Sequence, residues 1–118
     1  MFKVMDGSSG NVLGLQPQGK IEKQDYAEMI PKVEALVQEF KDVRMLCDMS
    51  EFKTEAPSAM FADMKFGNEF RHNIVKMAIV GDKRWEEWIT KLSAPFYARE
   101  AKYFHTADLA KAWEWVRS

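Results

Sequence analysis

The side chains able to carry out covalent chemistry are few in this sequence, and they are scattered. His72 and His105 are the only histidines among the 118 residues. Nucleophilic catalysis needs a serine or cysteine beside a base that a third group orients, and no Gly-x-Ser-x-Gly motif is present. His105, at the end of a predicted strand, could face Ser50 or Asp48 at the end of another, although a hydrogen bond within its own turn is the simpler interpretation. We predict no catalytic residue.

Cys47 is the only cysteine, and it lies inside the apolar run VRMLCDM. Burial in a strand raises the pKa of a thiol, so we predict that Cys47 is a small core residue rather than a nucleophile. A lone cysteine also excludes a disulfide framework and a pair of thiolates for zinc. The sequence has no cluster of metal ligands and no glycine-rich phosphate-binding motif. We therefore predict neither a metal nor a cofactor.

Gly81 and Asp82 separate an apolar run from a helical pattern that carries Trp85 and Trp88. The pair could form the lip of a ligand site or only the corner between a strand and a helix. Glycine suits a tight turn, and an aspartate before a helix accepts hydrogen bonds from the first free backbone N–H groups. We therefore predict a corner, followed by a helix that reaches Leu92.

Apolar residues recur with the periods of strands and helices along the whole chain. The segment DGSSG, residues 6–10, favours a tight reversal between two strands, and Asp25 followed by Glu28 favours the start of a helix. Pro31 lies inside that helical pattern, where a proline bends a helix or begins it. Thr106 is predicted to cap the last helix. The predicted elements are strands 2–5 and 11–16, helix 25–40, strand 43–49, helix 57–71, strand 74–80, helix 82–92, strand 101–104 and helix 106–116.

The resulting order is β-β-α-β-α-β-α-β-α, with connections that suit helical crossovers between parallel strands. This order predicts an α/β fold whose mostly parallel five-stranded sheet includes an N-terminal hairpin. A chain of 118 residues fits a single domain with one core. Arg44, Lys76 and Lys102 each lie inside a predicted strand. Either one face of the sheet is incompletely covered, or these cations lie at strand ends or edges.

The charged residues are balanced, with seventeen basic and eighteen acidic side chains and a formal net charge of -1. Because no basic block is present, nucleic acid is not an expected partner. The first residues, MFKVMDGSSG, lack the pattern of a signal peptide, and no apolar run approaches the roughly 18 residues of a membrane span. We expect a cytoplasmic protein without stable membrane insertion.

Flexible and aromatic apolar residues are abundant, with eight Met, eight Phe, four Trp and three Tyr. Methionine fills irregular or adaptable spaces because its thioether arm is flexible and polarizable. In the predicted helix 57–71, Phe61 and Met64 share one side, while Phe66 and Phe70 extend the apolar arc beyond the usual stripe. We expect this helix to face the sheet and also a ligand, a second subunit or neighbouring helices.

Five segments together resemble the SpoIIAA-like (STAS-type) family of small bacterial proteins over nearly the whole chain. They are Asp25-Tyr26 with Pro31, the strand VRMLCDM, ADMKFG, HNIVKMAIVGDKRWEEW, and AKYFH continuing into TADLAKAWEWV. The resemblance implies strand-helix units around a mixed sheet, akin to anti-sigma-factor antagonists and to the lipid-binding domains of CRAL-TRIO proteins. It implies no catalytic activity. Anti-sigma-factor antagonists carry a phosphorylatable serine in a D-S-S-G-like motif, which the corresponding segment DMSEFKTEAPSAMF lacks.

Two functional hypotheses follow, and an enzymatic function ranks third. In the first, the protein is a non-enzymatic binding module for a small apolar or amphipathic, lipid-like ligand. The expected contacts are Met49, Phe61, Met64, Phe66 and Phe70, with Ser50 or Asp48 orienting the polar end of the ligand. A core of this size leaves little room for a long acyl chain, so we expect a shallow pocket or one shared by a dimer. In the alternative, the same helix or the less covered sheet face binds a protein partner or a second copy of the chain.

Overall fold

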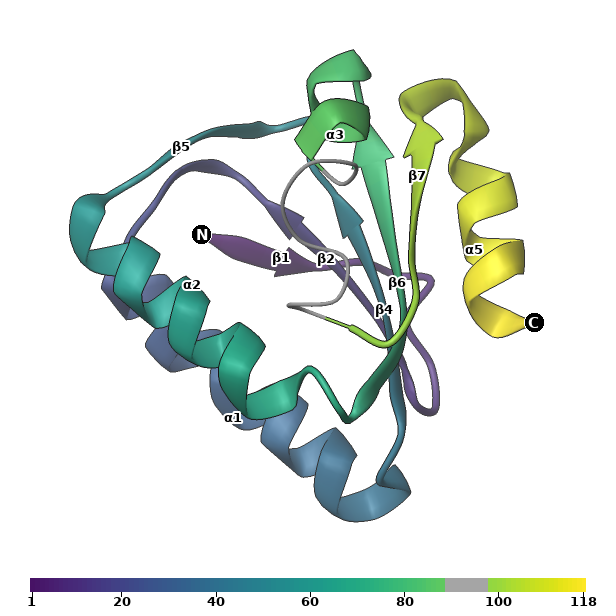
Figure 1. Cartoon of the computed structure of the whole chain (residues 1–118), viewed down its shortest axis with the longest axis horizontal. Helices are drawn as coiled ribbons and strands as arrows, with labels where there is room; N and C mark the ends of the chain where they lie inside the picture. Colours follow the sequence, from purple (N-terminus) through teal and green to yellow (C-terminus); the bar gives the residue numbers. More distant parts are fainter. Residues whose placement is uncertain (89–97) are drawn as a thin grey trace.

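The computed structural model describes residues 1–88 and 98–118, apart from the side chains of Phe61 and Trp88. A five-stranded sheet with the order β1-β2-β4-β6-β7 runs through the molecule (Figure 1). Its strands are β1 (Phe2–Val4), β2 (Val12–Pro17), β4 (Val43–Asp48), β6 (Ile74–Gly81) and β7 (Ala101–His105). β1 is antiparallel to β2, and the other three neighbouring pairs are parallel. The predicted α/β class is confirmed, and the sheet is mixed.

The predicted element order is wrong in one respect, because the described chain contains two further strands. β3 (Gly19–Ile21) and β5 (Phe52–Glu55) pair in parallel as a separate two-stranded sheet. The chain thus has seven strands among its described residues, not five. β3 is three residues long and β5 has two exposed polar residues at its centre, so neither shows a clear apolar period.

Two helices, α1 (Lys23–Phe40) and α2 (Pro57–Phe70), cover one face of the five-stranded sheet (Figure 1). α2 begins at Pro57, as predicted, because a proline is tolerated in a first helical turn. α1 begins before Asp25, whose carboxylate accepts a hydrogen bond from the Glu22 N–H at 2.8 Å. The predicted cap at Asp25 is therefore wrong by one turn. α1 also continues through Pro31, so it does not begin at the proline.

The helix α5 (Leu109–Arg117) packs on the opposite face of the sheet (Figure 1). A short 3-10 turn, η2 (Thr106–Asp108), leads into it from β7. The cap of this turn is His105, whose Nδ1 accepts a hydrogen bond from the Ala107 N–H at 3.1 Å. The local hydrogen bond predicted for His105 is confirmed. The predicted Thr106 cap is wrong, because His105 caps the 3-10 turn and Asp108 occupies the N-cap position of α5.

The helix α3 (Lys83–Trp88) follows β6 directly. The Asp82 carboxylate accepts a hydrogen bond from the Arg84 N–H at 3.0 Å, which supports the predicted corner. The predicted continuation of this helix through Ile89 and Leu92 lies outside the described residues. Among the described residues, no helix combines the length and the apolar character needed to cross a membrane.

The cations inside the strands follow both of the predicted alternatives. Arg44 donates a hydrogen bond to the Val116 carbonyl at 2.7 Å, and Lys76 donates one to the Trp115 carbonyl at 3.1 Å. The last carbonyls of a helix lack intrahelical partners and carry partial negative charge, so they suit cations. Under α5, the sheet face is therefore partly polar. Lys102 instead is exposed on the edge strand β7.

Candidate functional site

A cavity of about 280 Å³ lies between the sheet and the α1/α2 layer. Most of the side chains that line it are apolar, and they come from both sheets and from three helices. The described residues that line it are Phe2, Leu15, Pro17, Ile21, Tyr26, Met29, Met45, Cys47, Met49, Phe52, Glu55, Asp63, Phe66, Met77, Ile79 and Trp85. We call it the sheet–helix cavity.

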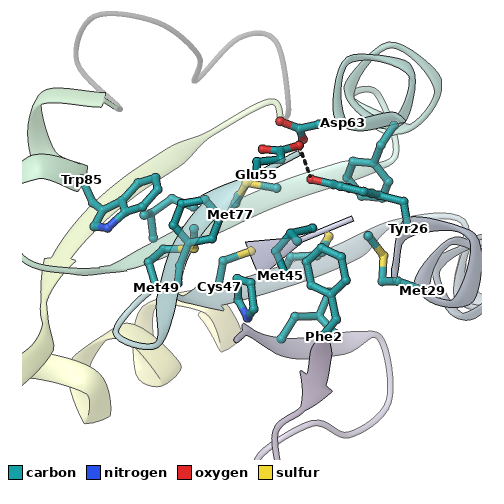
Figure 2. Close-up of a pocket in the computed structure, with 16 residues that line it drawn as sticks. Phe2, Tyr26, Met29, Met45, Cys47, Met49, Glu55, Asp63, Met77 and Trp85 are labelled. Atoms are coloured by element: carbon teal, nitrogen blue, oxygen red, sulfur yellow. Dashed lines mark hydrogen bonds between the residues drawn. The ribbon is translucent and has the colours of Figure 1, made fainter. Parts of the chain in front are cut away.

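The alternation of side chains along β4 decides which of them reach this cavity. Successive residues of a strand point to opposite faces of a sheet. Met45 and Cys47 therefore line the sheet–helix cavity, whereas Leu46 between them belongs to the cluster under α5. Figure 2 shows the short Cys47 side chain near the longer side chains of Met45 and Met49.

One end of the cavity is polar, because Tyr26 of α1, Glu55 of β5 and Asp63 of α2 meet there (Figure 2). The Tyr26 hydroxyl donates a hydrogen bond to Glu55 Oε1 at 3.3 Å. Burial, and then the charge of Asp63, raise the pKa of Glu55 from 4.5 to about 7, while the Tyr26 hydrogen bond acts in the opposite direction. Near neutral pH the Glu55 carboxyl is thus divided between its protonated and ionised forms.

Trp85 lies at the other end of the cavity, away from the two carboxyl groups (Figure 2). Its ring packs edge-to-face on Phe52, with 5.3 Å between the ring centroids. A Cβ atom on Gly81 would lie 2.5 Å from Cδ1 of Trp85. Gly81 is therefore needed for the close approach of Trp85. The corner at Gly81 and Asp82 is thus confirmed, and it also positions a residue that lines the cavity.

Cys47 does not have the environment of a reactive thiol. Burial, followed by the charges of Asp63 and Asp48, raises its pKa to about 12. A thiol with this pKa is almost entirely protonated at neutral pH and is a poor nucleophile. Among residues 1–88 and 98–118, no three His, Cys, Asp or Glu side chains lie close enough to hold a metal ion.

The structure brings only part of the predicted contact set into the cavity. Met49 and Phe66 line it. Phe70 is buried in the same core but is not a lining residue, and Met64 is 57% exposed. The side chain of Phe61 lies outside the described residues. Their roles in binding stay predictions.

The two polar residues predicted to orient a ligand lie away from the cavity. Asp48 is buried on the α5 side of β4, where its carboxylate accepts hydrogen bonds from Gln16 Nε2 at 3.1 Å and from the Ser50 N–H at 3.0 Å. Ser50 is exposed. The polar end of the cavity is made by Glu55 and Asp63 instead.

Several residues that line the cavity are absent from the predicted set of contacts. Only some of them could have been found from the spacing of apolar residues in the sequence. Tyr26 and Met29 are three residues apart in α1 and both are buried, a spacing that places them on one helix face. Glu55 lies in a short polar segment without a clear period. Only the pairing of β3 with β5 carries it to the cavity.

Comparisons with known proteins agree with this architecture. The sequence model of the SpoIIAA-like family matches residues 12–117. The chain is also similar to an uncharacterized protein of the DUF3478 family from Shewanella loihica PV-4, whose crystal structure has a SpoIIAA-like fold. That similarity has a TM-score of 0.79 and 25% sequence identity, and it covers 98% of this chain and 92% of that chain. No curated protein matches the sequence.

Proposed function

The chain belongs to the SpoIIAA-like family, and we propose that it is a non-enzymatic module that binds a small apolar or amphipathic ligand in the sheet–helix cavity. The observation that carries this proposal is the cavity itself, with a volume of about 280 Å³ and a mostly apolar lining. Small-molecule sites are typically concave and mostly apolar, with a few polar groups, and this cavity has that character. Four of its lining residues are methionines, which adapt to the shape of a ligand.

The volume sets the size of the ligand. An apolar cavity of about 150 Å³ holds one benzene molecule. By that measure the sheet–helix cavity fits roughly a dozen non-hydrogen atoms, which is near the lower limit of ordinary ligand pockets. A medium-length chain or one aromatic ring with a short arm fits this space, whereas a full-length lipid tail does not.

The side chains in and around the cavity that could act as nucleophiles or bases support binding of a ligand without its chemical conversion. Cys47 reaches the cavity as a neutral thiol. His105 forms its hydrogen bond within its own turn, while Asp48 is occupied by Gln16 and the Ser50 backbone. The described lining thus offers shape, apolar surface and a carboxyl pair rather than an activated nucleophile.

The methionine methyl groups provide a direct test. Protein labelled with 13C at these methyls should be titrated with 1-octanol, a neutral ligand of suitable size. Met29, Met45, Met49 and Met77 line the cavity, whereas Met60 and Met64 are exposed on α2. Saturable shifts confined to the first four signals are the expected result. If no concentration of 1-octanol moves them selectively, the cavity is not a binding site for ligands of this size.

A second candidate function is recognition of a protein partner through the outward face of α2. Met60 is 55% exposed and Met64 is 57% exposed, and they are four residues apart on one helix face. Exposed apolar side chains that adjoin each other suit a contact with another protein or a second copy of the chain.

Dilution of the protein labelled with 13C at its methionine methyl groups tests whether this face of α2 forms a homodimer. Self-association would change the Met60 and Met64 signals with protein concentration, and concentration-independent signals would argue against a homodimer through this face.

A further inference from the structure

We propose that the ligand of the sheet–helix cavity carries an aromatic ring, which packs against the thioether groups of the cavity methionines. This inference rests on the proposed function, since it names the ligand class for the same cavity. Either a medium-length chain or one aromatic ring with a short arm fits a cavity of about 280 Å³. The choice between them depends on the side chains that line the cavity (Figure 2).

Methionines line the cavity from both of the layers that enclose it. Met45 of β4 and Met77 of β6 are direct partners across two parallel strands, and neighbouring strands lie about 4.8 Å apart. Both line the cavity on the sheet side, and Met29 of α1 lines it on the helix side (Figure 2). A ligand in this space therefore meets thioether groups on more than one of its sides.

A thioether distinguishes an aromatic ring from a saturated chain. Its sulfur is polarizable and makes favourable contacts with a ring about 5 Å away, often at the ring edge. Each such contact is equivalent to about twofold to tenfold in affinity. A saturated chain gains only ordinary dispersion contacts with the same side chains. Two or more thioether contacts therefore favour an aromatic ligand by roughly tenfold.

Aromatic side chains provide further contacts of a kind that suits a ring. Phe2 packs edge-to-face on Tyr26, with 5.1 Å between the ring centroids, and Phe52 packs in the same way on Trp85. These four residues and Phe66 all line the cavity. Because aromatic rings have a negative face and a positive edge, a ligand ring can adopt the same favourable geometry beside them. More than half of the described lining residues are aromatic residues or methionines, so most of the contacts open to a ligand favour a ring.

Two alcohols that differ only in their ring provide the test. 2-Phenylethanol and 2-cyclohexylethanol have the same number of non-hydrogen atoms and the same hydroxyl arm. The saturated ring has the larger apolar surface, so the hydrophobic effect alone favours binding of 2-cyclohexylethanol. Calorimetric titration of the wild-type protein should show the opposite order. We expect 2-phenylethanol to bind at least about threefold more tightly, because only its ring gains the sulfur and aromatic contacts.

The methionine methyl signals report where the ring lies. The π electrons of an aromatic ring displace the proton signals of groups that lie against it, and a saturated ring has no such effect. In protein labelled with 13C at the methionine methyls, 2-phenylethanol should therefore move the Met45 and Met77 signals further than 2-cyclohexylethanol does. Met5 packs with the α5 cluster on the opposite face of the sheet, and its signal should not respond to either alcohol.

Methionine-to-leucine variants separate the effect of sulfur from that of apolar volume. The exchange nearly conserves volume, so the packing of the core should be retained. Met45→Leu and Met77→Leu should each reduce the preference for 2-phenylethanol over 2-cyclohexylethanol by at least about twofold, with little change in 2-cyclohexylethanol binding. Met5→Leu is the matched control, since it makes the same change on the other face of the sheet. It should leave both affinities unaltered, and circular dichroism verifies that each variant is folded.

The outcomes distinguish this inference from the proposed function beneath it. If both alcohols bind in the cavity and 2-cyclohexylethanol binds as tightly as 2-phenylethanol or more so, the aromatic assignment is overturned and the binding module stands. Tighter binding of 2-phenylethanol without the larger Met45 and Met77 shifts would also overturn the assignment, as would an unchanged preference in both folded leucine variants. If neither alcohol binds and 1-octanol does not bind either, both proposals fail. The wild-type measurements decide the matter even where a variant does not fold.

Discussion

At the scale of single residues, Glu55 differs from an ordinary surface glutamate in its raised pKa. It lies in a strand of four residues, yet it is only partly exposed and accepts a hydrogen bond from Tyr26. Its pKa is raised to about 7 by burial and by Asp63. Glu55 therefore links the folding of the chain to pH within the physiological range.

Replacing Glu55 with glutamine is expected to flatten the pH dependence of stability. The folded chain holds a proton that the unfolded chain releases at its ordinary pKa of 4.5, so the wild-type free energy of unfolding falls between that pH and the folded pKa of about 7. Since Glu55 is only partly buried, we expect a loss of about 1 kcal/mol across this window. Urea unfolding measured from about pH 5 to about pH 8 checks the prediction. The control Glu51→Gln should keep the wild-type dependence of the free energy of unfolding on pH. If Glu55→Gln also showed the wild-type pH dependence, the prediction for Glu55 would be contradicted.

At the scale of elements, the contact between α5 and β2 depends on one close approach. Trp113 of α5 lies against Gly14 of β2, where a Cβ atom would be 2.3 Å from Cη2 of the indole. The absence of a side chain on Gly14 therefore decides how near α5 can pack. Arg44 adds a polar attachment at the end of the same helix through the Val116 carbonyl.

Gly14→Ala is expected to destabilise the protein by about 1–3 kcal/mol, because the new methyl group forces the indole away from the sheet. The control is the same substitution in a Trp113→Leu background, where a smaller side chain leaves space for the methyl group. A double-mutant cycle from urea unfolding should show that Gly14→Ala costs at least about 0.5 kcal/mol less in that background. Equal costs in both backgrounds would mean that the indole is not the group that meets the alanine.

At the scale of the whole molecule, the two faces of the five-stranded sheet are filled differently. The face under α5 holds a small cluster that includes Leu46, Ala78 and Val80. The other face holds the larger core, and it also contains the sheet–helix cavity. Filling the cavity with protein atoms should therefore stabilise the chain and at the same time exclude a ligand.

Cys47→Leu is expected to stabilise the chain and to weaken the binding of a ligand in the cavity. The larger side chain gains contacts in unfilled space, which should raise the free energy of unfolding by about 1 kcal/mol. It should weaken binding of 1-octanol about tenfold, because the ligand and the leucine compete for one volume. Thermal unfolding with and without 1-octanol measures both quantities. Cys47→Ala is the matched control, since it removes the thiol without filling the cavity and should retain binding. Unchanged binding in the leucine variant would place the ligand elsewhere.

The sequence by itself determined the class of fold and most of its elements. The strand at residues 43–48, the helix from Pro57 and the hairpin before them follow from local periods of two and 3.6 residues and from local turn chemistry. The local role of His105 and the core position of Cys47 were predictable for the same reason. Each of these features depends on residues that are neighbours along the chain.

Only the tertiary structure decided where the cavity lies and which groups form its polar end. The pairing of β3 with β5 brings Glu55 beside Tyr26 of α1, which is 29 residues away in the sequence. No period or motif encodes this meeting, because it arises from the packing of separate elements around one sheet. Asp48 follows Cys47 in β4 and faces away from the cavity that Cys47 lines, because successive residues of a strand point to opposite faces. A strand of alternating side chains divides adjacent residues between two faces, and only the layers packed on those faces give each residue its surroundings.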